Sequence, residues 1–153
     1  MTFSRDYIVR MIEQLKKAID RIRKHTDEQQ YDDALDEVGD TCDDLLGHQA
    51  HMLNTLDCPS VIRILDKWPR IKVYVGLLQA EADVRAARRS PEDLPEVERL
   101  RQRALQLLLL GRAQGGRGDP DLKDAVRTLL PQVDSTALAA TYRAHLKDLG
   151  LAG

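Results

Sequence analysis

Apolar side chains recur every three or four residues along most of the chain, and this spacing limits the fold more than any other feature of the sequence. Side chains three or four residues apart share one face of an α-helix, whereas a half-buried strand needs strict alternation. The first such segment runs from Ser4, the expected N-cap, to about Lys24. Its apolar positions are Ile8, Met11, Ile12, Leu15, Ala18, Ile19 and Ile22. The spacing therefore predicts an all-α protein.

Similar segments follow, separated by short turns. A second helix is expected to begin near Tyr31 and to end at Gly47, where glycine accommodates a positive φ angle. A short third helix is expected after the N-cap Asp57, with Pro69 marking its end or a sharp bend. Residues 70–89 carry apolar side chains on two sides, which predicts a helix at the centre of the fold. Helices joined by short turns lie antiparallel, so we expect six or seven helices in successive hairpins.

A glycine-rich stretch follows another expected helix at residues 95–110. Because residues 111–120 contain four glycines and a proline, we expect a flexible, exposed connection there, with the linker itself at residues 113–120. It separates a core domain, residues 1–112, from a C-terminal helical hairpin, residues 121–153. The run Leu107–Leu110 covers a full helical turn, so its outer side chains need a further partner. Within the C-terminal hairpin, Pro131 is expected to interrupt the chain, and Asp134 or Ser135 is expected to cap the last helix. This hairpin is expected to dock on the face of Leu107–Leu110 or on a partner subunit.

Composition narrows the function classes. The chain is 42% hydrophobic and 31% charged with a net charge of -2, which is typical of a folded protein without a general affinity for polyanions. No stretch approaches the ~18 consecutive apolar residues that span a bilayer, and no apolar signal segment opens the chain, so we expect a soluble, cytoplasmic protein. Cys42 and Cys58 are expected to be small core residues. Trp68 is expected in the core where the hairpins meet.

Charge is distributed unevenly between the first two helical segments. Residues 5–24 contain seven basic and three acidic residues, whereas residues 27–44 contain nine acidic residues and no lysine or arginine. One interpretation is a solvated face with weak ion pairs to the first helix. The other is a docking surface for a basic segment of a partner protein, which would speed association and set partner choice. The partner-binding candidates are Asp32, Asp36, Asp40 and Asp43.

A metal centre is the first alternative. Cys42, His48, His51 and Cys58 lie close together in the sequence, and the two histidines share a face if their segment is helical. Their spacing, C-x5-H-x2-H-x6-C, lacks the paired ligand clips of zinc sites. The chain also lacks the Glu-x-x-His pairs of di-iron bundles. Two interpretations of these four residues are open. In one, the histidines lie on the surface and the cysteines lie in the core. In the other, the protein is a metal-dependent helical-bundle enzyme that uses His48 and His51.

Nucleic-acid binding is the second alternative, because arginines gather in one expected hairpin. They are Arg85, Arg88, Arg89, Arg99, Arg101, Arg103 and Arg112. Interleaved acidic residues are typical of a salt-bridged exposed face, and an aromatic content of 4% offers few stacking platforms for bases. The chain contains no G-x-S-x-G elbow, and its glycine-rich stretch lacks the lysine and hydroxyl of a phosphate loop. We therefore expect no catalytic residue and no bound cofactor.

The run Arg5-Asp6-Tyr7-Ile8-Val9-Arg10-Met11-Ile12-Glu13-Gln14 resembles a bacterial family of unknown function whose members begin R-D-Y-I-x-R-x-I-E-Q. The resemblance covers residues 5–110 and implies a tetratricopeptide-like stack or a helical bundle, with no established activity. The segment 98–107 is similar to the second helix of a tetratricopeptide repeat. The sequence thus favours a non-catalytic protein–protein interaction module, either an adaptor or a homodimer. Its expected surface is the acidic helix face or the groove between the 70–89 and 95–110 helices.

Overall fold

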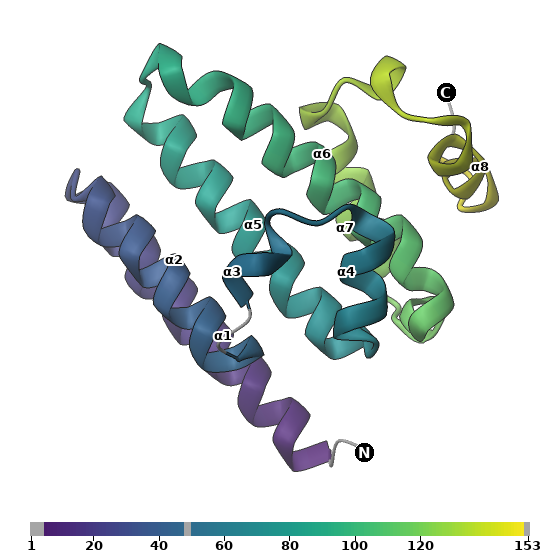
Figure 1. Cartoon of the computed structure of the whole chain (residues 1–153), viewed down its shortest axis with the longest axis horizontal. Helices are drawn as coiled ribbons and strands as arrows, with labels where there is room; N and C mark the ends of the chain where they lie inside the picture. The colour runs from purple at the N-terminus through teal and green to yellow at the C-terminus, as the bar shows by residue number, and fades with distance from the viewer. Residues whose placement is uncertain (1–4, 48–49, 152–153) are drawn as a thin grey trace.

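The computed structural model describes residues 5–47 and 50–151, and this part of the chain contains eight α-helices and no strand (Figure 1). The helices are α1 Arg5–Asp27, α2 Tyr31–Leu46, α3 Ala50–Leu53, α4 Cys58–Leu65, α5 Trp68–Arg88, α6 Leu94–Leu110, α7 Leu122–Leu129 and α8 Ala140–Asp148. The expected all-α fold is confirmed, with one helix more than the upper expected number. None of the described helices is long and apolar enough to cross a membrane.

The first two helices form a hairpin that the apolar spacing predicts correctly. The buried side chains of α1 are Met11, Leu15, Ala18 and Ile22. α1 extends to Asp27 instead of about Lys24, and Gln29 turns the chain with a φ of 61°. Gly47 ends α2 with a φ of 97°, a backbone angle at which glycine has no steric penalty. The expected N-cap Ser4 lies outside the described residues.

The boundary between α4 and α5 differs from the sequence prediction. Asp57 caps α4 as expected, since its Oδ1 accepts a hydrogen bond from the Ser60 backbone N at 2.7 Å. α4 then ends before Asp66, which has a φ of 65°. Pro69 does not end α4, because Trp68 and Pro69 begin α5, and the chain bends between the two helices at Asp66 and Lys67. Proline is tolerated in a first turn, where its missing N–H would have no intrahelical partner.

α5 is the central helix and contacts α1, α2, α4 and α6, as its two apolar sides predict (Figure 1). Tyr74 is 1% exposed, and its hydroxyl donates a hydrogen bond to Asn54 Oδ1 at 2.5 Å. Gly76 faces Leu15 of α1, and a Cβ atom at this position would lie 3.4 Å from the Leu15 side chain, which is an ordinary van der Waals contact. The core of the hairpin stack is therefore organised around this helix.

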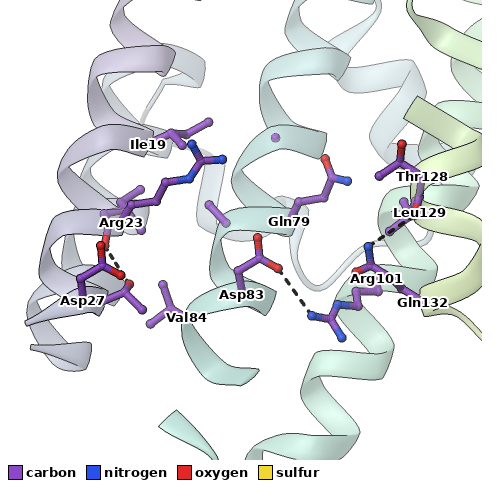
Figure 2. A pocket seen from close by; sticks show the side chains of 14 residues that line it. Ile19, Arg23, Asp27, Gln79, Asp83, Val84, Arg101, Thr128, Leu129 and Gln132 are labelled. Carbon is purple, nitrogen blue, oxygen red and sulfur yellow. Dashed lines mark hydrogen bonds and ion pairs between the residues drawn. The ribbon is translucent and has the colours of Figure 1, made fainter. Parts of the chain in front are cut away.

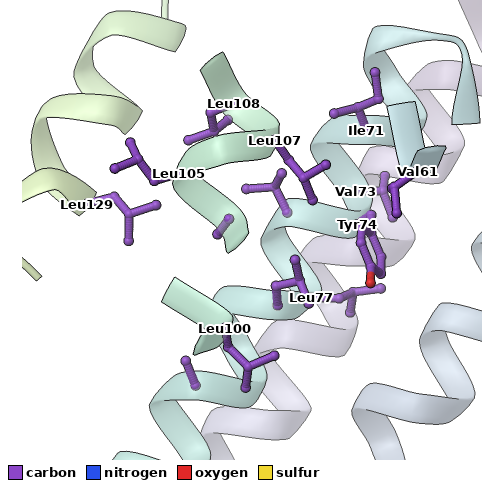
Figure 3. Close-up of a cluster of buried hydrophobic side chains, with 14 of the residues drawn as sticks. Val61, Ile71, Val73, Tyr74, Leu77, Leu100, Leu105, Leu107, Leu108 and Leu129 are labelled. Atoms are coloured by element: carbon purple, nitrogen blue, oxygen red, sulfur yellow. The ribbon is translucent and has the colours of Figure 1, made fainter. Parts of the chain in front are cut away.

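α6 is also apolar on two sides (Figure 3). Leu107 lies toward α5, and Leu105 lies toward Leu129 of α7. All three leucines are at most 1% exposed. The further partner expected for the run Leu107–Leu110 is provided by α7 and α8, which both contact α6 of the same chain.

The glycine-rich segment is packed against the start of α5. It forms two short 3-10 helices, η2 Gly111–Gln114 and η3 Gly116–Gly118, and a Cβ atom at Gly111 would lie 2.5 Å from the Trp68 ring. Asp119 Oδ2 accepts hydrogen bonds from Trp68 Nε1 at 2.9 Å and from Lys72 Nζ at 2.7 Å. The expected exposure of this linker is therefore wrong at Gly111 and Gly116, which are buried. Trp68 is buried, as expected for a core residue.

The C-terminal part continues from α7 through further short turns. Pro131 interrupts the chain in the 3-10 helix η4 Leu130–Gln132, as expected. Asp134 accepts a hydrogen bond from the Thr136 backbone N at 3.0 Å, but it caps the 3-10 helix η5 Ser135–Ala137 and not the last α-helix. Buried side chains of this part, including Leu138 and Leu146, belong to the same apolar cluster as those of α1 to α6. The division into domains at residues 113–120 stays a prediction.

Candidate functional site

The four aspartates expected to bind a partner lie on the exposed face of α2. The Asp32 side chain is 95% exposed, and its Oδ1 lies 3.6 Å from Arg88 Nη1. Within the described residues no ion pair joins Asp36, Asp40 or Asp43 to a cation. The one pair between α1 and α2 joins Arg21 to Glu37. The carboxylates of these aspartates therefore remain largely uncompensated by the basic first helix.

The metal-ligand candidates are not brought together by the described part of the fold. His51 is exposed, and the buried Cys58 donates its thiol to Gln106 Oε1 at 3.2 Å. Cys42 is half-buried, and burial together with the nearby carboxylates Asp43 and Glu81 raises its pKa to about 12. Such a thiol is protonated at neutral pH and is a poor metal ligand.

His48 lies outside the described residues. In the chain that the structure describes, no group of three or more histidine, cysteine, aspartate or glutamate side chains is arranged to hold a metal ion. The metal interpretation has no geometric support there.

The arginines of the central hairpin are mostly engaged within the chain. Arg85 and Arg88 both donate to Asp93, and Arg99 donates to Glu96. The hydrogen bonds from these arginines lower the pKa of Asp93, with Arg88 contributing most. Arg103 is buried, and its guanidinium donates to the carbonyls of Leu53 and Leu56.

Arg112 is also engaged, because its Nη1 lies 3.2 Å from His145 Nδ1 of α8. The ion pairs of the hairpin's arginines with Asp93 and Glu96 agree with the salt-bridged face that the acidic residues between these arginines indicate. They also leave few of these guanidinium groups free to contact phosphates.

A cavity that the sequence does not reveal lies where α1, α5, α6 and α7 meet (Figure 2). Its volume is about 330 Å³. Ile22, Val84 and Leu129 form its buried apolar wall. Its polar side chains come from four separate parts of the chain and are Arg23, Thr26, Asp27, Gln79, Asp83, Arg101, Thr128 and Gln132. The residues are spread over more than a hundred positions, so no local spacing could have indicated this site.

The charges around the cavity balance but are only partly paired. Arg101 Nη2 lies 3.5 Å from Asp83 Oδ1, which is the outer limit of a hydrogen bond (Figure 2). No carboxylate of the described residues forms an ion pair with Arg23. Arg101 Nε is buried and has no hydrogen-bond partner in this part of the chain. The cavity therefore offers the weakly paired guanidinium ends of Arg23 and Arg101 beside an apolar wall.

No protein-family model matches the chain, and neither a curated protein nor a solved structure is similar to it. The resemblance of the first helix to the family opening R-D-Y-I-x-R-x-I-E-Q stays a prediction. Function has to be argued from the geometry of the cavity and of the α2 face.

The chemistry available in the cavity is suited to holding a ligand. Its lining contains no serine, cysteine, histidine or lysine, and the Thr26 hydroxyl donates to the Ile22 carbonyl at 2.8 Å. The groups that remain are guanidinium, carboxylate, amide and the Thr128 hydroxyl, which recognise a ligand through charge and hydrogen bonds. Small-ligand sites usually combine an apolar wall with a few polar groups, as this one does.

Proposed function

We propose that this protein is a non-catalytic interaction module, acting in the cytoplasm, that holds a segment of a partner protein in the cavity between α1, α5, α6 and α7. The observation that carries the proposal is the convergence of four charged side chains, joined only by the 3.5 Å contact between Arg101 and Asp83, on an open cavity of about 330 Å³ with a buried apolar wall. Grooves between helices bind protein segments through shape and a small number of charges. The cavity proposed here lies beside the hairpin of α5 and α6. It differs from the groove between these two helices that the sequence suggested.

The arginine contacts favour a protein ligand over a nucleic acid. Phosphate binding needs a row of accessible cations. In the described hairpin, Arg85 and Arg88 are held by Asp93, while Arg103 is buried against backbone carbonyls. This arrangement supports recognition of a segment with few charges.

The acidic face of α2 is a second candidate surface, in line with the charge distribution of the sequence. Asp36 and Asp40 are four residues apart on one helix face, where like charges destabilise the helix. A basic segment would relieve that repulsion. The basic face of α1 on a second copy of this chain has suitable charge, which makes a homodimer one form of this candidate. A salt-dependent dimer in sedimentation velocity would distinguish that form from binding of another protein.

The cavity is tested by filling it. Ala80 of α5 lines the cavity and Ala87 of the same helix is exposed, so Ala80→Met and Ala87→Met are a matched pair. A partner is first identified by affinity capture from the native cell, purified, and measured with each variant. We expect Ala80→Met to weaken its binding at least tenfold and Ala87→Met to leave it unchanged. Equal affinity of both variants contradicts the proposed site.

The α2 face is tested in the same assay by charge removal. The variant combines Asp32→Asn, Asp36→Asn, Asp40→Asn and Asp43→Asn. Its control combines Glu13→Gln, Asp20→Asn, Glu98→Gln and Asp121→Asn, which changes the net charge equally at exposed positions elsewhere. Loss of binding in the first variant alone would assign the partner to α2. Retention of binding in both, with loss in Ala80→Met, assigns it to the cavity.

A further inference from the structure

We propose that the cavity between α1, α5, α6 and α7 binds a carboxylate that stands next to an aliphatic side chain on the partner segment. This inference rests on the proposed function and adds the chemistry of the bound group. The carboxylate would lie between Arg23 and Arg101, with the aliphatic side chain against the apolar wall.

The apolar part of the cavity fits a single branched side chain. Ile22, Val84 and Leu129 are each at most 2% exposed, so the wall is held in place by the core. Gly76 adds no side chain to the α5 side of the cavity. A volume of about 330 Å³ is at the lower end of the usual range of ligand sites, ~300–1,000 Å³. The cavity therefore has room for one or two residues and not for a folded surface.

Two arginines approach the cavity from different helices. Figure 2 shows Arg23 extending from α1 toward α5, and Arg101 on the other side of Gln79. Guanidinium groups recognise carboxylates through paired N–H donors. Arg23 forms no ion pair within the described residues, and Arg101 Nη2 reaches Asp83 Oδ1 only at 3.5 Å, so the terminal N–H groups of these two side chains are available to a ligand oxygen.

The nearby acids favour a single negative charge on the ligand. Asp27 and Asp83 line the same cavity, so the two arginines face two carboxylates and the rim is neutral overall. A doubly charged phosphate would meet these carboxylates at close range. A carboxylate carries one charge, and the aspartates can accept hydrogen bonds from the N–H groups of the bound segment. This balance selects the carboxylate over the phosphate.

Peptide binding to the full-length protein tests the inference. The probes are a fluorescent peptide ending in two leucines with a free carboxylate, the same peptide as its C-terminal amide, and an amidated peptide with glutamate beside the leucines. We expect at least one carboxylate-bearing peptide to bind ten times more tightly than the amide without glutamate. Binding of the free acid alone assigns the C-terminal carboxylate, and binding of the glutamate peptide alone assigns an acidic side chain. Binding of both supports the shared chemistry.

Variants connect the preference to the two arginines. Arg23→Gln and Arg101→Gln should each reduce carboxylate binding at least fivefold, whereas Arg10→Gln, an exposed change on α1, should not. Thermal melting of each variant shows whether it is folded, and Arg23→Gln removes no hydrogen bond or ion pair within the described chain. Equal affinity for acid and amide, or no binding of any probe at millimolar concentration, overturns the inference. The proposed function survives that result if Ala80→Met still releases the purified partner.

Discussion

At the scale of single residues, two glycines in helical conformation predict opposite effects of the same substitution. A Cβ atom at Gly111 would lie 2.5 Å and 2.9 Å from two atoms of the Trp68 ring, so Gly111→Ala must displace the indole. Overpacking of this kind costs ~1–3 kcal/mol. Gly39 lies inside α2 with nothing within 4 Å of its Cβ position. Gly39→Ala should therefore stabilise the protein by ~1 kcal/mol, because alanine is the better helix former.

Urea unfolding of the two variants and the wild type measures both effects. Since the substitution is identical, the difference in unfolding free energy reports only the two environments. A Gly111→Ala variant as stable as the wild type would contradict the tight contact with Trp68.

The two cysteines should resist modification in the folded protein. With a pKa of about 12, Cys42 is almost entirely a neutral thiol at pH 8, and burial also raises the pKa of Cys58. Because the thiolate is the reactive form, iodoacetamide should alkylate native protein slowly and urea-unfolded protein rapidly. Mass spectrometry counts the alkyl groups at each time. Rapid alkylation of Cys42 in native protein would show that α2 opens readily or that this thiol has another role.

At the scale of structural elements, Asp119 fastens the glycine-rich segment to the first turns of α5. Burial alone would raise its pKa, but hydrogen bonds from Lys72, Trp68 and the Asp121 backbone outweigh burial and lower the pKa below the ordinary value. Asp119→Ala removes the acceptor of the Trp68 N–H and should cost ~1–3 kcal/mol. Asp119→Asn keeps an oxygen acceptor and should cost less.

Because the folded pKa of Asp119 is lowered, its ionised form stabilises the fold at pH values above the unfolded pKa of ~3.9. That stabilisation is lost as the pH falls through the folded pKa. The stability difference between the wild type and Asp119→Asn should therefore be constant near pH 7 and shrink below about pH 4. Thermal melting from pH 2 to pH 7 measures it. A difference that does not change with pH would mean that Asp119 acts through its shape and not through its charge.

These elements also show how much of the fold and site could be predicted from the sequence. Apolar spacing predicted α1, α2, α5 and α6, because apolar side chains three or four residues apart come to lie on one face only when the segment is helical. Pro69 was ambiguous, since proline suits both the end of one helix and the first turn of the next. The burial of Gly111 could not be predicted, because glycine serves flexible linkers and close contacts equally. The cavity depends on how α1 and α7 are placed beside α5, which local patterns do not determine.

At the scale of the whole molecule, the structure joins the C-terminal helices to the core that α1 to α6 build. Val126 and Leu129 of α7 are at most 1% exposed, and Leu105 of α6 lies toward Leu129 (Figure 3). Each such side chain contributes ~1.5–3 kcal/mol through burial, against a total stability of ~5–15 kcal/mol for a typical domain. A fragment comprising residues 1–118 should therefore be strongly destabilised and prone to aggregate.

Calorimetry and circular dichroism of the fragment and the full chain test this expectation. The full chain should unfold in one transition, since a single apolar cluster connects its helices. Adding residues 119–153 as a separate polypeptide should restore helicity to the fragment, because α7 and α8 can still cover α6. A fragment that melts at the temperature of the full chain would instead show that residues 1–118 fold independently of α7 and α8. In that case the contacts of α7 and α8 with α6 would add little to stability, and their role in completing the cavity beside Thr128 would be the stronger reason for their position.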